Sequence, residues 1–216
     1  MEIVFLGNGG GRIVLDQQIL PTAGFRINSN NFKMHVDPGP GALVKSIEHK
    51  QIPWELDAIF VSHCHIDHCN DANMIIESLN FGNFKGGRGI LVGAQSVIDG
   101  KGTFEKQLDD YFKAMLKLCK PLVAGETHKF SESISIKATK TVHEDPSDIG
   151  FVLSIEGIKI GYTSDTEYFD GITEEYEGCE FLIFNCLRPN NDHLEFHFSS
   201  QDVIKTVDGM KTKPIA

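Results

Sequence analysis

The segment Ser62-His63-Cys64-His65-Ile66-Asp67-His68 holds three imidazoles and one carboxylate within six residues. It follows directly on an apolar run that predicts a short buried strand. In extended backbone His63 and His65 point to the same side, because side chains alternate with a period of two. Asp67 and His68 lie where the chain turns into the next expected helix, so they can face the first pair. Imidazole and carboxylate together suit zinc, manganese or iron, and the segment therefore predicts a metal site.

The composition is that of an ordinary globular chain. Of the 216 residues, 41% are hydrophobic and 23% are charged, so a sizeable core is expected and disorder is not. There are 20 Lys and Arg against 30 Asp and Glu, a net charge of −10. Binding of long nucleic acids needs clustered positive charge, so that class of partner is not expected. The longest apolar runs fall far short of the ~20 residues that cross a bilayer, so we expect no membrane segment.

Cysteine usage and the first residues of the sequence both favour the cytoplasm. The five cysteines are an odd number without a Cys-x-x-Cys pair, which makes a poor disulfide framework and a poor cysteine-zinc site. The opening MEIVFLGNGG lacks the basic and long apolar regions of a secretory signal. We therefore expect reduced thiols and a cytoplasmic protein.

Strand-like and helix-like segments alternate in each half of the chain, which predicts one domain of the α/β class over residues 1–216. The expected strands are residues 2–6, 25–28, 32–36, 57–62, 89–92, 133–138, 150–155, 159–162 and 181–184. The expected helices are residues 42–49, 71–79, 104–118 and 201–208. The helix over 104–118 rests on an amphipathic stripe, and the last helix on Ser199 or Ser200 as its cap.

The spacing His-x-His-x-Asp-His resembles the metal motif of the metallo-β-lactamase-fold hydrolases, and other motifs of that family occur in order along the chain. Leu6-Gly7-Asn8-Gly9-Gly10 looks like the family's first strand and turn, and Asp37-Pro38-Gly39-Pro40-Gly41 like its Asp-x-Gly-x-Gly motif. Thr141-Val142-His143 resembles the segment that carries the next metal histidine, and Tyr162-Thr163-Ser164-Asp165-Thr166 the strand end with a metal-bridging Asp. The resemblance covers nearly the whole chain. It implies an αβ/βα four-layer sandwich, with two mixed sheets and helices on the outer faces.

The resemblance also implies a dinuclear metal centre. It places His63, His65 and His143 on one metal, and Asp67 and His68 on the other, with Asp165 bridging the two. Asp37 is expected behind the ligands, where it would orient a ligand histidine. The cofactors implied are two divalent ions, zinc first, with manganese or iron as alternatives.

The family's final metal histidine, which lies on a late strand, is missing at its expected place. The sequence ends at Lys213-Pro214-Ile215-Ala216, which looks like the start of that strand. Truncation, absence of the segment, and replacement by His193 or His197 all stay open, and the second metal is expected to bind less tightly. However, His197-Phe198-Ser199-Ser200-Gln201-Asp202 resembles a phosphodiesterase pattern in which the histidine acts near the leaving group. We therefore assign His197 a catalytic role first and a ligand role second, and we count Asp67 with it as catalytic.

The function implied by the resemblance is metal-dependent hydrolysis through a metal-bridging hydroxide. Retention of Asp67 favours the dinuclear hydrolases, and the pattern at His197 favours phosphodiesterases that protonate an alkoxide leaving group. The sequence contains no basic insertion like the arm with which tRNA 3′-processing endonucleases grip tRNA. The expected substrate is therefore a small or cyclic phosphodiester, with cyclic ribose phosphates of phosphonate metabolism as a hint to its class. A tRNA 3′-processing-type endonuclease, a lactonase, a mononuclear iron oxygenase, a non-catalytic metal-binding relative and a homodimer stay open.

Overall fold

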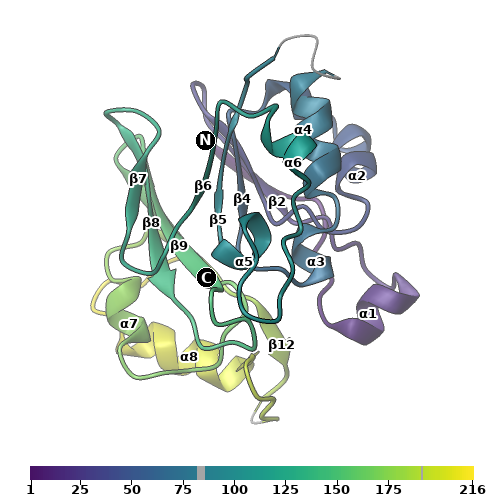
Figure 1. The fold of residues 1–216 in the computed structure, drawn as a ribbon. Helices are drawn as coiled ribbons and strands as arrows, with labels where there is room; N and C mark the ends of the chain where they lie inside the picture. The colour runs from purple at the N-terminus through teal and green to yellow at the C-terminus, as the bar shows by residue number, and fades with distance from the viewer. Residues whose placement is uncertain (82–85, 191) are drawn as a thin grey trace. The chain divides into compact units, whose positions relative to one another are not determined.

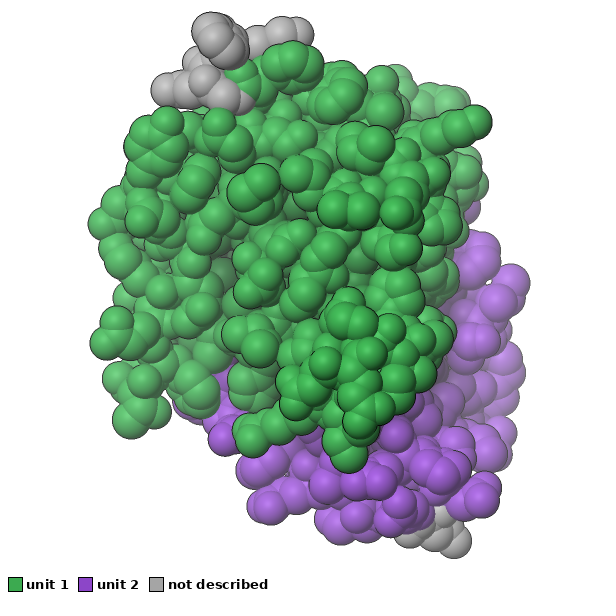
Figure 2. Space-filling view, turned by 90° about the vertical axis from the view of Figure 1, so that its right-hand side faces the viewer, with its two compact units in different colours: residues 1–121 green, residues 122–216 purple. Residues whose placement is uncertain are grey.

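Residues 1–121 form a unit built on a six-stranded sheet, and residues 122–216 form a second unit built on a five-stranded sheet. The computed structural model describes residues 1–81, 86–190 and 192–216. Figure 1 labels the helices and strands, and Figure 2 colours the two units. Each unit is described by itself below.

The sheet of the first unit changes from antiparallel to parallel pairing along its strand order. Its six strands are, in that order, β1 (Glu2–Phe5), β2 (Phe25–Asn28), β3 (Lys33–Val36), β4 (Ala58–Val61), β5 (Ile90–Gly93) and β6 (Leu118–Pro121). The first three pair antiparallel, and the strands predicted over residues 25–28 and 32–36 are adjacent in this sheet as β2 and β3. From β3 to β6 all pairs are parallel, so a crossover segment must connect each strand to the next.

Short helices supply these crossovers in the first unit. The helix α1 (Arg12–Gln17) connects the antiparallel strands β1 and β2, and the crossovers contain α2 (Ala42–Glu48), the 3₁₀ turn η1 (Pro53–Glu55), α3 (Ile66–Cys69), α4 (Ala72–Asn80), α5 (Gln95–Ile98) and α6 (Asp110–Lys113). The longest of them, α4, buries one stripe formed by Ala72, Ile75, Ile76 and Leu79, the spacing of a single helix face. Every residue of β4 is buried, as expected of a strand with parallel neighbours on both sides. Complete burial of each large apolar side chain here contributes ~1.5–3 kcal/mol.

The second unit contains a mostly antiparallel sheet. Its strands, in spatial order, are β11 (Phe181–Ile183), β10 (Ile158–Tyr162), β9 (Ile149–Ile155), β8 (Ile134–Lys140) and β7 (Thr127–Lys129). Only β10 and β11 pair in parallel. Glu156 and Gly157 connect β9 to β10 with φ angles of 52° and 81°, and two successive positive values suit the type I′ turn that favours tight hairpins. Ile215 makes a parallel bridge with Phe181, so the last residues run beside β11.

Two helices and two short strands complete the second unit. The remaining elements are α7 (Ile172–Glu175), β12 (Cys186–Arg188), β13 (Phe198–Ser199) and α8 (Ser200–Gly209). Ser199 caps α8 as predicted, in a reciprocal capping box with Asp202. Tyr176 is completely buried, and its hydroxyl makes hydrogen bonds with Thr139 Oγ1 at 2.7 Å and with the carbonyl of Tyr162 at 3.1 Å.

The helix predicted over residues 104–118 is wrong, because only α6 is helical in that range. The backbone N–H groups of Gln107 and Leu108 donate to the carbonyl of Val97 instead of to a preceding helical turn. Asp109 then caps α6 by accepting the N–H two residues ahead of it. Leu108 is nevertheless buried, so the apolar stripe does mark core positions.

The predicted α/β class with mixed sheets is confirmed. The short elements α1, η1, α3, α5, α7, β6, β7, β12 and β13 were not predicted from the sequence. Over residues 1–81, 86–190 and 192–216, no helix is long and apolar enough to cross a membrane.

Candidate metal centre

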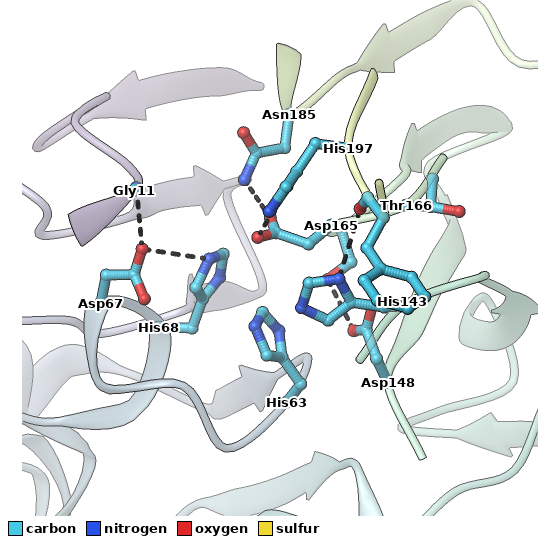
Figure 3. Close-up of polar contacts among 12 residues, drawn as sticks. Gly11, His63, Asp67, His68, His143, Asp148, Asp165, Thr166, Asn185 and His197 are labelled. Carbon is cyan, nitrogen blue, oxygen red and sulfur yellow. Dashed lines mark hydrogen bonds and ion pairs between the residues drawn. The ribbon is translucent and has the colours of Figure 1, made fainter. Parts of the chain in front are cut away.

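The first unit gathers three histidine rings just beyond the end of β4. His63 follows the strand, and His68 lies on α3, whose short turn brings the chain back toward the strand end. The ring centroid of His63 lies 4.6 Å from that of His65 and 4.2 Å from that of His68. His63 and His68 are buried, and His65 is half-buried. The sequence motif thus forms a compact cluster of imidazole rings in this unit, of which Figure 3 labels His63 and His68.

A buried carboxylate and a hydroxyl hold these rings in place. Asp37 follows β3, the parallel neighbour of β4, so the two strand ends bring it beside Ser62. Its carboxylate accepts hydrogen bonds from Ser62 N at 2.7 Å and from Ser62 Oγ at 2.8 Å, and it lies 2.9 Å from His68 Nδ1. Ser62 Oγ also lies 3.0 Å from His63 Nδ1. Acceptors beside Nδ1 favour the tautomer with the proton on that nitrogen, and Nε2 is then the atom of His63 and His68 that could bind a metal.

Asp67 adds a carboxylate on the same short helix. One of its oxygens accepts the backbone N–H of Gly11 at 3.2 Å and lies 3.9 Å from His68 Nε2. That separation is too long for a hydrogen bond, but it is close to the ~3.4 Å between two ligands that each bind a tetrahedral zinc at ~2.1 Å. Burial raises the pKa of Asp67, but the charge of His68 and the backbone hydrogen bonds outweigh burial and hold the pKa below its ordinary value. Asp67 is therefore ionised at neutral pH, as a metal ligand requires.

The second unit forms its own group of possible ligands. A carboxylate oxygen of Asp165 and ring nitrogens of His143 and His197 all lie within 4.8 Å of one another. His197 Nδ1 is 3.6 Å from Asp165 Oδ2. His143 Nδ1 lies 3.3 Å from the carbonyl of Phe196, so donation to that carbonyl leaves Nε2 as its ligand atom.

Several neighbours fix Asp165 and His143 in the second unit. Asn185 follows β11, the parallel neighbour of β10, and donates a hydrogen bond from Nδ2 to Asp165 Oδ1. Ser164 adopts a left-handed φ of 55° just before Asp165, and its hydroxyl donates a hydrogen bond to Asp148 Oδ1. Thr166 Oγ1 accepts the N–H of the residue before His143. These contacts immobilise the strand end, a condition for a precise ligand position.

The structure brings the predicted residues together in two sets. His63, His65, Asp67 and His68 form one set with Asp37 behind it, and His143, Asp165 and His197 form the other. His193 is exposed and belongs to none of the possible ligand groups found among the described residues. Sequence reasoning missed the roles of Ser62 and Asn185, although each follows a strand whose parallel neighbour is followed by a predicted site residue.

The donors are those of a divalent transition-metal site. Imidazole nitrogens combine with carboxylate oxygens, and hydrogen-bond acceptors hold the Nδ1 atoms of His63, His68 and His143. This combination suits zinc, manganese or iron, and the residues of each set fit such ions.

Comparison with known proteins assigns the family. The profile of the β-lactamase superfamily domain matches residues 33–215. The chain therefore belongs to the β-lactamase superfamily, whose members are generally metal-dependent hydrolases with the metallo-β-lactamase fold.

A curated relative and two solved structures extend this comparison. The chain is 42% identical to the uncharacterized protein MJ1374 of Methanocaldococcus jannaschii over 214 residues, which are 99% of this chain and 80% of that protein. The metallo-β-lactamase fold protein YhfI from Bacillus subtilis matches with a TM-score of 0.72 and 20% identity, covering 95% of this chain and 79% of that one. The short form of human tRNase Z matches with a TM-score of 0.68 and 14% identity, covering 96% of this chain and 88% of that one. The fold of the family is thereby confirmed.

Proposed function

We propose that this chain is a phosphodiesterase that hydrolyses a small or cyclic phosphodiester with two divalent metal ions, zinc first. The observation that carries the proposal is the pair of ligand sets, one in each unit, with imidazole and carboxylate donors oriented by buried partners. Family membership supports metal-dependent hydrolysis, and the donor chemistry supports zinc, manganese or iron.

The proposed metal ligands come from both sets. We propose that His63, His65 and His143 hold one ion, that Asp67 and His68 hold the second, and that Asp165 serves both. When bound, two such ions supply a water of lowered pKa and stabilise the charges on the attacking and leaving oxygens. Asp37 acts through Ser62 and His68 by keeping the imidazoles in the tautomer that presents Nε2.

His197 is proposed to protonate the leaving oxygen. Its Nδ1 faces Asp165 Oδ2 at 3.6 Å, so Nε2 is the atom left to hold and donate a proton. The side chain is 20% exposed, which leaves room for a substrate to reach it. An alkoxide leaving group has a high proton affinity, and general-acid catalysis is typically worth ~10²–10⁴-fold in rate. The same ring is also a possible ligand, so its role needs a test that separates the two.

The charge of the chain supports a small substrate. A net charge of −10 disfavours the long phosphate track of a folded RNA. The fold likeness to human tRNase Z keeps tRNA processing as the competing activity, which an activity screen must include. A cytoplasmic location is proposed as well, because all five cysteines lie in the described chain and none forms a disulfide.

The test is a hydrolysis screen of the full chain reconstituted with zinc, manganese or iron. The substrates are bis-(p-nitrophenyl) phosphate, cyclic nucleotides, a lactone, a thioester and a tRNA precursor with a 3′ extension. We expect phosphodiester hydrolysis that requires metal and that falls at least 100-fold in Asp165→Asn, a loss typical of disabled transition-state stabilisation. Asp170→Asn removes the same charge from the same unit outside both ligand sets and serves as the matched control.

Three results would contradict the proposal. Cleavage of the tRNA precursor in preference to small diesters would assign the competing activity. Turnover of the lactone or thioester alone would assign a different reaction class. Stoichiometric metal binding without turnover of any substrate would identify a non-catalytic relative.

A further inference from the structure

A second candidate site lies in the first unit among residues 1–55, away from the ligand residues of both sets. It is a cavity of about 390 Å³, within the ~300–1,000 Å³ typical of small-molecule sites. Its lining includes Arg26, Asn28, Lys33, Lys50 and Gln51, together with the carboxylates Glu2 and Glu55. The proposed function uses none of these residues.

Arg26 is the unusual member of this lining. The residue is only 1% exposed, although it carries a guanidinium on the second strand of the sheet. One terminal nitrogen donates to Ser46 Oγ at 3.0 Å and to the carbonyl of Gln51 at 3.2 Å. Its Nε has no hydrogen-bond acceptor among the described residues. A buried donor without an acceptor is costly, and a buried cation without a counter-charge is more so.

The nearby carboxylates do not neutralise Arg26. Glu2 accepts a hydrogen bond from Asn28, and Glu55 pairs with Lys33. Within the described chain, no carboxylate oxygen lies within 4.0 Å of the Arg26 guanidinium. Burial lowers the pKa of Arg26 to about 9, which still leaves it charged at neutral pH. The cross-strand neighbour His35 is also completely buried and adds no negative charge.

The rim of the cavity adds a second uncommitted cation. Lys50 is exposed, and its ammonium has no hydrogen-bond or ion-pair partner in the part of the chain that the structure describes. With Lys33 paired to Glu55, the lining holds the two cations Arg26 and Lys50 against the single remaining carboxylate of Glu2, on a chain whose net charge is −10. The amides of Asn28 and Gln51 add further polar groups beside them.

We propose that this cavity binds a small organic anion whose phosphate or carboxylate group faces Arg26. A planar guanidinium matches both oxyanions, and charge-assisted hydrogen bonds to them are stronger than neutral ones. The cavity is larger than a single oxyanion requires, so the organic part of the ligand occupies the rest. Bound there, the ligand supplies the counter-charge that the protein lacks at this position.

The first experiment observes Arg26 directly in the metal-loaded full chain. The sequence contains four arginines, so the Nε–H region of a ¹⁵N NMR spectrum is simple, and Arg26→Met assigns the signal of interest. Inorganic phosphate is the probe for a phosphate ligand and citrate the probe for a carboxylate ligand. A saturable shift of the Arg26 signal with either probe supports the site and tells the two chemistries apart. An Arg26 signal that neither probe moves overturns the proposal, and phosphate held only at the metals gives this result.

The second experiment measures affinity by calorimetry in paired variants. Lys50→Asn removes the rim cation, and asparagine tolerates the left-handed φ of 58° at this position. It should weaken binding of the active probe about 3-fold, as expected for one exposed ion pair. Lys45→Asn removes an equal charge from the nearby helix α2 outside the lining and should change nothing. An unchanged affinity in Lys50→Asn would overturn the placement in this cavity.

The buried cation is tested by its own pair of variants. Arg26→Met should lower the affinity at least 10-fold, whereas Arg88→Met, at a half-buried arginine of the same unit outside the lining, should leave it unchanged. Retention of full affinity in folded Arg26→Met would contradict the proposal. If Arg26→Met does not fold, substitution of the other three arginines assigns the Arg26 signal by elimination, and that signal and the Lys50→Asn affinity decide the question.

Discussion

Replacement of Asp37 by asparagine should weaken metal binding without breaking the fold. The wild-type carboxylate is 3% exposed and accepts hydrogen bonds from Ser62 N and Ser62 Oγ, with His68 Nδ1 at 2.9 Å. Asparagine is nearly the same size, and it tolerates the left-handed φ of 49° at this position better than most residues do. The change therefore removes charge and one acceptor atom with little backbone strain.

The size of the effect follows from these contacts. Removal of the charge weakens a hydrogen bond worth ~1.5–3 kcal/mol and turns an amide NH₂ toward donors that need an acceptor. His68 then loses the partner that keeps the proton on Nδ1, and the other tautomer places a proton on the ligating Nε2. Loss of such a supporting partner typically lowers metal affinity ~10–100-fold, or ~1.4–2.7 kcal/mol. We expect that range for Asp37→Asn.

The assay is competition for zinc against a chromophoric chelator, with urea unfolding of the metal-free protein run in parallel. Asp57→Asn is the matched control, because Asp57 is an exposed carboxylate that accepts a backbone N–H of β3 and lies outside both ligand sets. The reasoning is refuted if Asp37→Asn binds zinc as tightly as the wild type. It is also refuted if the control loses affinity to the same extent.

Three further predictions concern the leaving group, the core and a close backbone contact. His197→Ala should keep its metal and lose ~10²–10⁴-fold in rate on alkyl phosphodiesters. The loss should be much smaller on p-nitrophenyl esters, because their leaving group needs no proton. Equal losses on both substrates in steady-state assays, or loss of metal, would make His197 a ligand instead. Tyr176→Phe should lower the free energy of unfolding, measured in urea, by ~1–3 kcal/mol, because Thr139 Oγ1 and the carbonyl of Tyr162 lose their buried partner. A change below roughly 0.5 kcal/mol, the scatter of neutral surface substitutions, would argue against this network. Gly39→Ala should lower the free energy of unfolding by ~1–3 kcal/mol and weaken zinc binding, because the new Cβ would overlap the carbonyl oxygen of Asp67. Wild-type stability and wild-type zinc affinity in the same assays would contradict this prediction.

The sequence was most informative where chemistry and backbone geometry coincide. The spacing of His63, His65 and His68 predicts their grouping, because a strand end followed at once by a helix leaves few other arrangements. The Glu156-Gly157 turn and the Ser199 cap were predictable for the same reason, since each is set by a few adjacent residues. Turns and helix caps are determined by a few neighbouring residues, so they can be predicted without knowledge of the whole fold.

The sequence was least informative where distant backbone groups decide the structure. Residues 104–118 carry a helical pattern of apolar side chains, yet the carbonyl of Val97 accepts two N–H groups that the helix would have used. Short strands such as β12 and β13 depend on pairing partners that no local pattern reveals. The roles proposed for Asp37, His143, Asp165 and His197 stay predictions, because they depend on how a bound metal and substrate use the positions described.

The same arrangement of strands orients a proposed metal ligand in each unit, although the two sheets differ in topology. In the first unit Asp37 and Ser62 directly follow the parallel strands β3 and β4, and they hydrogen-bond each other and support the histidines. In the second unit the only parallel pair of the sheet, β10 and β11, ends near Asp165 and Asn185, which hydrogen-bond each other. Parallel neighbours end at the same sheet edge, so a ligand and the group that orients it can come from segments far apart in the sequence. An antiparallel pair would place the residues that follow its two strands at opposite edges, so it could not bring Asp37 beside Ser62 or Asp165 beside Asn185 in this way.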